Sequence, residues 1–413
     1  MEKRVLIAGG GIIGLTTAYY LNKAGHHVTI IDRHDFLTNC STRNAGLIVP
    51  SHFVPLASPG IVWQGIKWIF NDKSPFSINI KADIDLAKWG FRFWNSSTRK
   101  NVRDASPVLF GLNSFSKELY KSLDQETGLS TDYNERGLLM LFRSAAKGEE
   151  EVKMAEEAHK LGILAQIMTP SEIRELEPET EFDVKGGIFY PGDASIMADR
   201  FMISLINYLK TREVSMLPEN ELIDISISGN RAVKAITNRG TIDFDELVIS
   251  GGVQSQKLFN KLGANIQVQS GKGYSFSLKT GARLNTPLIL TDARVSVTPY
   301  ENFTRFAGAM EIGGVENSIK KRRILGMVES INRFIPGIKM ELPAANRVWS
   351  GLRPCSVDGL PYIGRLNKYS NIVIATGHSM MGVSLAPATG KLVEELISGK
   401  SPSVDLKPFR PER

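Results

Sequence analysis

The chain has little of what a disulfide-bonded, metal-dependent or membrane-spanning protein needs. Its 413 residues include two cysteines, Cys40 and Cys355, too few for a disulfide framework or a four-thiolate iron–sulfur cluster. The six histidines show no metal-ligand spacing, so we expect no metal site. No uncharged apolar run is long enough to cross a bilayer, and a signal peptide would cut through a glycine motif that begins at Gly9. These absences predict a cytoplasmic protein.

Basic charge is present, but it is scattered. The formal net charge is +7, and residues 320–323 are the only dense basic cluster. Nucleic-acid binding needs a contiguous basic stripe, so the pattern argues against nucleic acid as a partner. It is compatible with acidic substrates or an anionic membrane surface. The chain also exceeds the usual limit for one hydrophobic core, so we predict two closely packed domains.

The strongest positive signal lies in residues 4–33. An apolar run, VLIA, is followed by GGGIIG, a helical stretch and a second apolar run that ends in Asp32. Gly9 permits a tight turn, Gly11 lets backbone N–H groups approach a pyrophosphate, and Gly14 allows the helix to pack closely on the strand. Asp32 is placed to accept hydrogen bonds from a ribose. The stretch predicts dinucleotide binding. An ordinary strand-to-helix turn is the alternative, and the pattern does not separate FAD from NAD.

Apolar runs elsewhere extend this plan along the chain. Further strands of the nucleotide-binding sheet are expected around Val248 and around Val373. Long insertions lie between them, and alternating patterns in residues 266–278 and 287–299 are typical of an antiparallel sheet. The sequence therefore predicts a mixed α/β (α+β) fold, with a Rossmann-like nucleotide-binding domain split along the chain and an antiparallel-sheet substrate domain.

The expected domain boundaries follow from these runs. The nucleotide-binding domain is assigned residues 1–80, 196–255 and 346–413, and the substrate domain residues 81–195 and 256–345.

Two further segments have readable patterns. A long helix is predicted from Val108 to Thr127, because Pro107 suits a helix start and Gly128 a helix end. Residues 61–70 are apolar, aromatic and cationic. That composition is compatible with contact with a membrane surface, although core packing is the favoured interpretation.

Seven short motifs follow one another along the chain. They are AGGGIIG at 8–14, STRNAG at 41–46, ASPGIVWQGIKW at 57–68, GKGY at 271–274, WSGLRP at 349–354, DGLPYIG at 358–364 and TGH at 376–378. In order and spacing they resemble the D-amino-acid oxidase-like FAD-dependent oxidoreductases, and they look closest to the bacterial D-amino-acid dehydrogenases of the small-subunit type. The resemblance covers nearly the whole chain. It implies that the dinucleotide is FAD and that the split domain is an FAD-binding domain.

The resemblance also implies a set of FAD-binding residues. They are Gly9, Gly11, Ile12, Ile13, Gly14, Asp32 and Arg33 at the ADP half; Ser41, Arg43, Asn44, Ala45, Gly46 and Leu47 beside the pyrophosphate and isoalloxazine; Gly351, Gly377, His378, Met381, Gly382 and Val383 around the flavin ring; and Val253 on the ribityl or adenine side. Relatives that attach FAD through a cysteine have it at a position that matches near Gly351. FAD is therefore expected to bind noncovalently, with Cys355 as a small buried residue.

Three residues are assigned to the substrate site. Arg353 in GLRP matches the arginine that binds the substrate carboxylate in amino-acid oxidases of this group, and a planar guanidinium holds a carboxylate through two parallel hydrogen bonds. A surface salt bridge is the alternative. Tyr274 is expected to add a hydroxyl near the same carboxylate, with an edge-strand tyrosine as the alternative. His52 is expected to line the pocket, because hydride transfer from a neutral amine needs orientation rather than a side-chain base.

The implied activity is that of an FAD-dependent dehydrogenase. A hydride passes from the Cα of a D-amino acid, or of a D-proline-like imino acid, to flavin N5 and leaves an imine or 2-oxo acid. Electrons then pass to a membrane quinone or another carrier, which is compatible with a peripheral location on the inner face of the membrane. A homo-oligomer is also compatible with the resemblance. Two alternatives stay open: an oxygen-using oxidase of glycine, sarcosine or a D-amino acid, and a structural or RNA-modifying flavoprotein.

Overall fold

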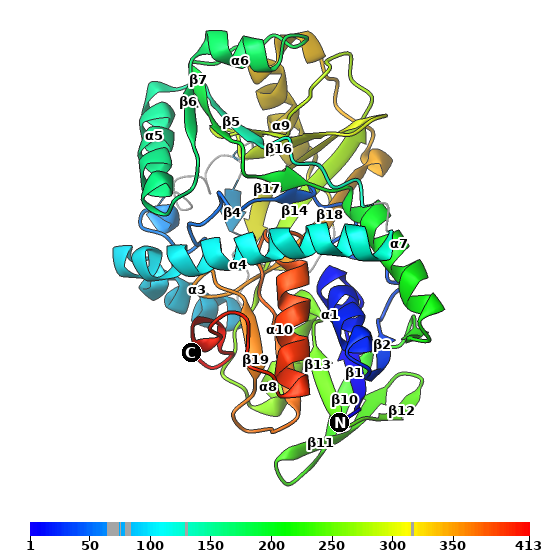
Figure 1. Ribbon diagram of the computed structural model, residues 1–413. Helices are drawn as coiled ribbons and strands as arrows, with labels where there is room; N and C mark the ends of the chain where they lie inside the picture. The colour runs from blue at the N-terminus through cyan, green and yellow to red at the C-terminus, as the bar shows by residue number, and fades with distance from the viewer. Residues whose placement is uncertain (64–73, 75, 79–83, 129–130, 315–317) are drawn as a thin grey trace.

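Two β-sheets organise the molecule. The computed structural model describes residues 1–63, 74, 76–78, 84–128, 131–314 and 318–413. A six-stranded sheet occupies the lower half of Figure 1 and a nine-stranded sheet the upper half, and the long helix α4 (Arg99–Thr127) crosses between them. Both chain ends lie in the lower half. The mixed α/β fold class is confirmed.

The six-stranded sheet is built from distant parts of the sequence. Its order is β19 (Tyr362–Arg365), β20 (Ile372–Thr376), β13 (Glu246–Ile249), β1 (Arg4–Ala8), β2 (His27–Ile31) and β9 (Ser215–Leu217). All its pairs are parallel except β19 with β20. The strands predicted near Val248 and Val373 therefore join the N-terminal unit, as expected. The short strands β9 and β19 were not predicted.

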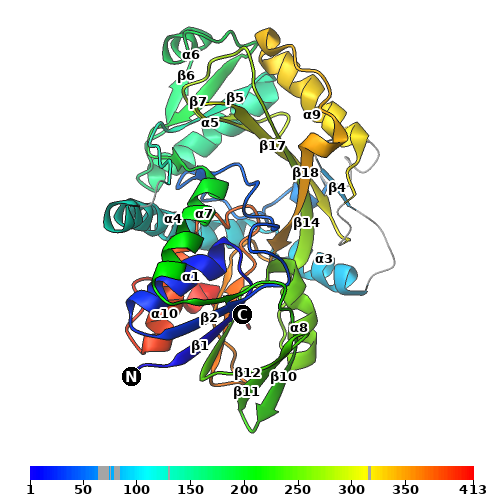
Figure 2. The same ribbon diagram turned by 90° about the vertical axis from the view of Figure 1, so that its right-hand side faces the viewer.

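Helices and a small sheet cover the two faces of this sheet. On one face lie α1 (Ile12–Lys23), α7 (Ala198–Thr211) and α10 (Ala386–Ser398). On the other lie α8 (Ser255–Leu262), the short helix η1 (Gly252–Gln254) and an antiparallel sheet of β10 (Leu222–Ser228), β11 (Arg231–Thr237) and β12 (Gly240–Asp243). Figure 2 shows this small sheet projecting from the lower end.

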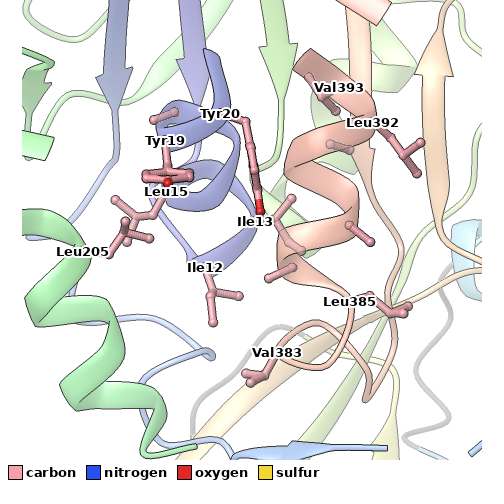
Figure 3. Close-up of a cluster of buried hydrophobic side chains, with 14 of the residues drawn as sticks. Ile12, Ile13, Leu15, Tyr19, Tyr20, Leu205, Val383, Leu385, Leu392 and Val393 are labelled. Carbon is pink, nitrogen blue, oxygen red and sulfur yellow. The ribbon is translucent and has the colours of Figure 1, made fainter. Parts of the chain in front are cut away.

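Helix α1 is enclosed on nearly all sides. Every residue from Ile12 to Leu21 is buried. Figure 3 shows Ile13 and Tyr20 turned toward α10, and Leu15 and Tyr19 toward Leu205 of α7. The contact with α10 is so close that a Cβ on Gly390 would lie 2.7 Å from the backbone of Thr16. This packing fixes the direction in which the N-terminus of α1 points.

The nine-stranded sheet is not purely antiparallel, which corrects the prediction. Its order is β18 (Val348–Cys355), β14 (Gln269–Leu278), β17 (Thr304–Ile312), β16 (Val295–Pro299), β15 (Leu288–Leu290), β5 (Leu138–Phe142), β7 (Gly186–Tyr190) and β6 (Gln166–Met168), with β4 (Phe76–Ile78) beside β17. The pairs β15–β5 and β17–β4 are parallel. Each of these pairs joins segments far apart in the sequence, so no hairpin dictates an antiparallel direction.

Strand membership also departs from the expected domain segments. Residues 76–78 and 348–355 were expected in the nucleotide-binding domain, yet β4 and β18 belong to the nine-stranded sheet. β18 does so because it pairs with β14 along eight positions, from Gln269 to Phe276. Elsewhere the boundaries stay a prediction.

Shorter elements complete the chain. They are β3 (Leu47–Ile48) paired with β8 (Ala194–Ser195), the helices α3 (Ile84–Ser96), α5 (Ala145–Lys160), α6 (Pro170–Leu176) and α9 (Lys321–Phe334), and the turns η2 (Pro336–Ile338), η3 (Ala345–Arg347) and η4 (Lys407–Phe409). Figure 2 places α9 against the outer face of the upper sheet. Of residues 61–70, those from 64 on lie outside the described residues. Within the described ranges, no helix is both long and apolar enough to span a bilayer.

The long helix α4 begins earlier than predicted. Pro107 lies inside it, and the helix begins at Arg99, where the Thr98 side chain accepts a hydrogen bond from the N–H of Asn101 at 3.1 Å. A proline removes one backbone donor from a helix interior. Tertiary contacts of α4 offset the lost hydrogen bond. One of them is the Tyr120 hydroxyl of this helix, which donates to the carbonyl of Val383 at 2.6 Å. The predicted end at Gly128, with φ 61°, is confirmed.

The contact between α1 and α10 gives a stability prediction. In Gly390→Ala the new methyl meets rigid backbone of α1, so we expect a loss of about 1–3 kcal/mol of unfolding free energy. Gly111→Ala is the matched control, because Gly111 lies within α4 with open space around its Cβ position. That variant should gain about 0.4–1 kcal/mol. Thermal unfolding midpoints of the two variants should move in opposite directions, and a shared direction would contradict the packing argument.

Candidate active site

A cavity of about 620 Å³ lies between the two sheets. Its wall is contributed by the ends of β1 and β2, the segment from residue 38 to 58, the strands β14, β17 and β18, and the turn before α10. A volume of this size is typical of a site for a cofactor or small ligand. Of the predicted site residues, Gly14, Gly46 and Gly377 do not line it.

The N-terminus of α1 faces this cavity. Gly11 is the N-cap residue and supplies no side chain, so backbone N–H groups at the start of the helix face the cavity together with its positive dipole end. Asp32 holds the glycine turn, because one carboxylate oxygen accepts from the N–H of Gly10 at 2.7 Å and the other from His34 at 2.8 Å. Gly14 acts through packing, since a Cβ there would lie 1.9 Å from the carbonyl oxygen of Gly9.

The segment from Ser41 to Gly46 is held by hydrogen bonds to its backbone. The carbonyl oxygens of Arg43, Asn44 and Ala45 accept from Ser275 at 2.9 Å, Arg305 at 3.1 Å and Thr298 at 2.8 Å respectively. All three donors come from the nine-stranded sheet. Gly46 has φ 76°, and its Cβ would lie 2.0 Å from the carbonyl oxygen of Ile196, which explains why it packs behind the wall.

The turn before α10 closes another side of the cavity. His378, Met381, Gly382 and Val383 line it. The ring of His378 is turned toward α10, where Nε2 lies 2.9 Å from the Thr389 hydroxyl, and burial lowers the pKa of this histidine to about 3. Gly377 does not line the wall. It packs against the ring of Tyr362, to which a Cβ at this position would come within 2.8 Å.

Arg353 is a partly buried cation that faces the cavity. Its Nη1 donates to the carbonyl of Ala309 at 3.0 Å, and among the described residues no carboxylate forms an ion pair with it. The alternative of a surface salt bridge is therefore wrong. Burial lowers the pKa of the guanidinium. Gly273 makes room for it, because a Cβ there would lie 1.8 Å from Nη1 of Arg353.

Tyr274 lies on the cavity wall, but its hydroxyl is bonded away from Arg353. Adjacent residues of a strand point to opposite faces, and Gly273 faces Arg353. Tyr274 packs into the core on the other face, where its hydroxyl donates to Glu311 at 2.5 Å. The strand directs the hydroxyl toward Glu311 rather than toward the guanidinium, and a role beside the substrate carboxylate stays a prediction.

His52 lines the cavity, as predicted, with two partners that the sequence did not reveal. Its Nδ1 lies 3.1 Å from the Ser51 hydroxyl, which donates to the buried carboxylate of Asp193. Burial lowers the pKa of His52 to about 4 and raises that of Asp193 to about 7. In the sequence Asp193 follows a strand in a Gly-Asp pair, a pattern typical of an ordinary turn.

Other wall residues were also missed. They include Ser250, Gly251, Gly252, Trp349, Ala309, Met310, Met140, Lys147, Glu151 and Arg294. Most come from the two sheets at positions where only the fold brings them together. For Trp349 the sequence did hold a local signal, the WSG triplet. The glycine of this triplet, Gly351, leaves room for the tryptophan ring, which a Cβ there would approach to 2.0 Å.

Solved structures share this fold. Glycine oxidase from Geobacillus kaustophilus superposes with a TM-score of 0.80 at 22% identity, covering 100% of this chain and 99% of that one. L-proline dehydrogenase from P. horikoshii gives 0.75 at 21% identity, covering 100% and 97%.

Curated sequences are similar over their whole length. D-amino acid dehydrogenase of Granulibacter bethesdensis is 29% identical over 97% of both chains, and that of Helicobacter pylori is 26% identical over 96% of this chain and 95% of its own. The family model described as FAD dependent oxidoreductase matches residues 4–396. The chain therefore belongs to the FAD-dependent oxidoreductase family, and FAD is its cofactor.

Proposed function

We propose that the protein oxidises the Cα–N bond of a D-amino acid, or of a D-proline-like imino acid, and passes the electrons to a quinone or another carrier. The observation that carries this proposal is Arg353, a partly buried guanidinium that faces the cavity without a carboxylate partner among the described residues. The names of the relatives at 26–29% identity support the choice of D-amino acids.

The wall of the cavity suits FAD. The N-terminus of α1 has Gly11, Ile12 and Ile13 on the wall, and its Ile12 N–H donates to the Ser41 hydroxyl at 3.2 Å. Its other backbone N–H groups would hold the pyrophosphate. Asp32 at the end of β2 would hold the adenosine ribose, and the turn from His378 to Val383 would lie against the flavin. The remaining predicted contacts that line the cavity are proposed in the same sense: Arg33, Ser41, Arg43, Asn44, Ala45, Leu47, Val253 and Gly351.

Arg353 contributes by orientation. A planar guanidinium binds the α-carboxylate through two parallel hydrogen bonds, and this fixes the direction of the Cα–H bond in the cavity. FAD, when bound, supplies the two-electron acceptor at flavin N5. Trp349 and Gly351 form the neighbouring wall, so the substrate is held against a rigid strand rather than a loop.

The electron acceptor separates the proposal from an oxidase with the same fold. The protein is reduced anaerobically with members of a panel of D- and L-amino acids and then mixed with air. We expect D-amino acids such as D-alanine, or cis-4-hydroxy-D-proline, to bleach the flavin, with slow reoxidation in air and fast reoxidation by a quinone analogue. Fast reoxidation with peroxide release would favour the oxidase, and no bleaching by any amino acid would favour a flavoprotein without amino-acid turnover.

Arg353 gives a kinetic prediction. Arg353→Met removes two charge-assisted hydrogen bonds worth about 1.5–3 kcal/mol each, so KM for the amino acid should rise at least ~100-fold. The flavin absorbance spectrum should stay unchanged. Arg347→Met is the control, because Arg347 is exposed just before β18. A change in KM of less than about threefold in Arg353→Met would refute the carboxylate-binding role.

Gly11 gives a prediction about the cofactor. Its φ of −69° is open to any residue, and a Cβ there meets only the Ser41 hydroxyl at 3.5 Å. Asp is favoured as an N-cap, so Gly11→Asp should fold normally while its charge repels the pyrophosphate. We expect purified Gly11→Asp to lose its 450 nm flavin absorbance, whereas the neutral Gly11→Asn keeps more of it. Equal FAD content in both variants would argue against pyrophosphate binding at this helix end.

We also propose that α3 contacts an anionic membrane surface. Ile84, Phe91 and Trp94 are exposed along one side of this helix, with exposed Lys88 among them and a net positive chain to support the contact. Phe91→Ser/Trp94→Ser should abolish co-sedimentation with vesicles of anionic phospholipid. Leu164→Ser, which removes an equally exposed apolar side chain elsewhere, should leave it unchanged. If both variants co-sediment with the vesicles equally well, α3 does not contact the membrane.

A further inference from the structure

Asp193 is a buried carboxylate that the proposed function does not use. It follows β7 and is 1% exposed. Its oxygens accept hydrogen bonds from one residue, through the Ser51 N–H at 3.1 Å and through the Ser51 hydroxyl. Among the described residues no cation forms an ion pair with it. A buried carboxylate without a cation is costly to keep ionised.

When Asp193 is ionised, the hydrogen-bond partners assign the proton positions in the row from Asp193 to His52. The Ser51 hydroxyl has one hydrogen, and it donates this hydrogen to Asp193. At the contact with His52, 3.1 Å long, Nδ1 must therefore be the donor and the serine oxygen the acceptor. A neutral ring with its hydrogen on Nδ1 has a bare lone pair on Nε2. No hydrogen-bond partner for Nε2 is found within the described ranges, and His52 lines the cavity.

Resting on the proposed oxidation of an amino acid, we propose that Nε2 of His52 accepts the ammonium proton of the bound substrate and that Ser51 and Asp193 carry the proton onward. An amino acid arrives as an ammonium carboxylate. Its nitrogen needs a free lone pair before the Cα–N single bond can become a double bond, so a base must remove one proton first. His52 is the catalytic residue in this step, and Ser51 and Asp193 are positioning residues that act through it.

The step balances in protons and moves no electrons between molecules. The substrate nitrogen loses one proton to Nε2, and Nδ1 gives its own proton to the Ser51 oxygen. Ser51 passes its former hydroxyl proton to Asp193. The ring ends neutral with its hydrogen on Nε2, and the added proton rests on the carboxyl group. The starting arrangement returns when Nε2 gives its hydrogen to solvent and the row runs in reverse, from Asp193 through Ser51 to Nδ1.

The electrostatics agree with storage on the carboxyl group rather than on the ring. Burial lowers the pKa of His52 to about 4, so an imidazolium is disfavoured, and raises the pKa of Asp193 to about 7. The other charged or titratable groups around the row are few. Lys117 of α4 donates to the carbonyl of Gly192 at 2.8 Å and is paired with Glu135, Tyr190 lies on β7, and Glu151 of α5 is paired with Lys147.

The sign of the pH dependence follows. Above the pKa of Asp193 the carboxylate is ionised and the row can accept a proton. Below it the carboxyl group is already protonated, so kcat/KM should fall as the pH drops below about 7. The test uses the FAD-loaded enzyme and measures kcat/KM for a D-amino acid from pH 6 to about 10 with a dye acceptor.

Two variants interrupt the row at different points. Ser51→Ala removes the link, and Asp193→Asn makes residue 193 a donor, which reverses the hydrogen bonds and leaves the hydrogen on Nε2. Both should lower kcat/KM about 100-fold near pH 7, the size of a lost general base. The loss should shrink toward high pH, where the substrate gives its proton to water. Ser51→Thr keeps a hydroxyl and should restore the neutral-pH rate. Ser275→Ala removes a buried hydroxyl that is bonded to a backbone carbonyl, and its pH profile should keep the wild-type shape.

A purely structural role predicts a different result. It would lower kcat/KM by the same factor at every pH in Ser51→Ala and Asp193→Asn, and that outcome overturns the proposal. Infrared difference spectra without substrate give an independent measurement, in which a protonated carboxyl band should titrate near pH 7 and be missing in Asp193→Asn. If no amino acid reduces the wild-type enzyme, the proposed function fails; absence of the titrating band overturns the row of proton carriers on its own.

Discussion

One buried cation holds the two halves of the molecule in register. Arg305 of β17 is 2% exposed, pairs with Asp199 of α7 at 3.0 Å and donates to the carbonyl of Asn44 at 3.1 Å. Its guanidinium also lies over the rings of Tyr300 and Phe303. Burying a charge is favourable only when each of its donors finds a partner. The partners come from the FAD-binding half and from the sheet opposite, so the cavity between them depends on this interaction.

Features that depend on neighbouring residues alone could be predicted from the sequence. The turn at Gly9 to Gly14 was readable because a tight turn, a close backbone approach and helix packing each demand glycine. Arg353 was readable because its neighbours form a recognisable motif. Tyr274 was not, since the side of the sheet on which a residue falls depends on strand register, and β14 shifts register against β17 between Lys272 and Tyr274.

Tertiary packing decided the remaining differences. Pro107 is a reasonable helix start in isolation, but α4 gains enough contact with α10 to keep a proline in its interior. Ser51 and Asp193 are 142 residues apart in sequence, and their hydrogen bond exists only because the chain of β3 returns beside β8. The spacing of apolar residues along the sequence gives no information about such a long-range hydrogen bond. The glycines at 273 and 351 likewise make sense only after β14 and β18 are seen side by side.

The hydrogen bonds that hold the segment from Arg43 to Ala45 end on carbonyl oxygens, which every amino acid possesses. The path of this segment therefore depends on one of its own side chains, that of Asn44, which accepts a hydrogen bond from the Gly46 N–H at 2.8 Å, and otherwise on its backbone. Mutations of Arg43 and Ala45 change what the cavity presents to its ligands while the backbone bonds between the halves stay in place. Substitution on this part of the cavity wall is in this way largely separate from folding, so the wall can change in evolution while the fold is retained.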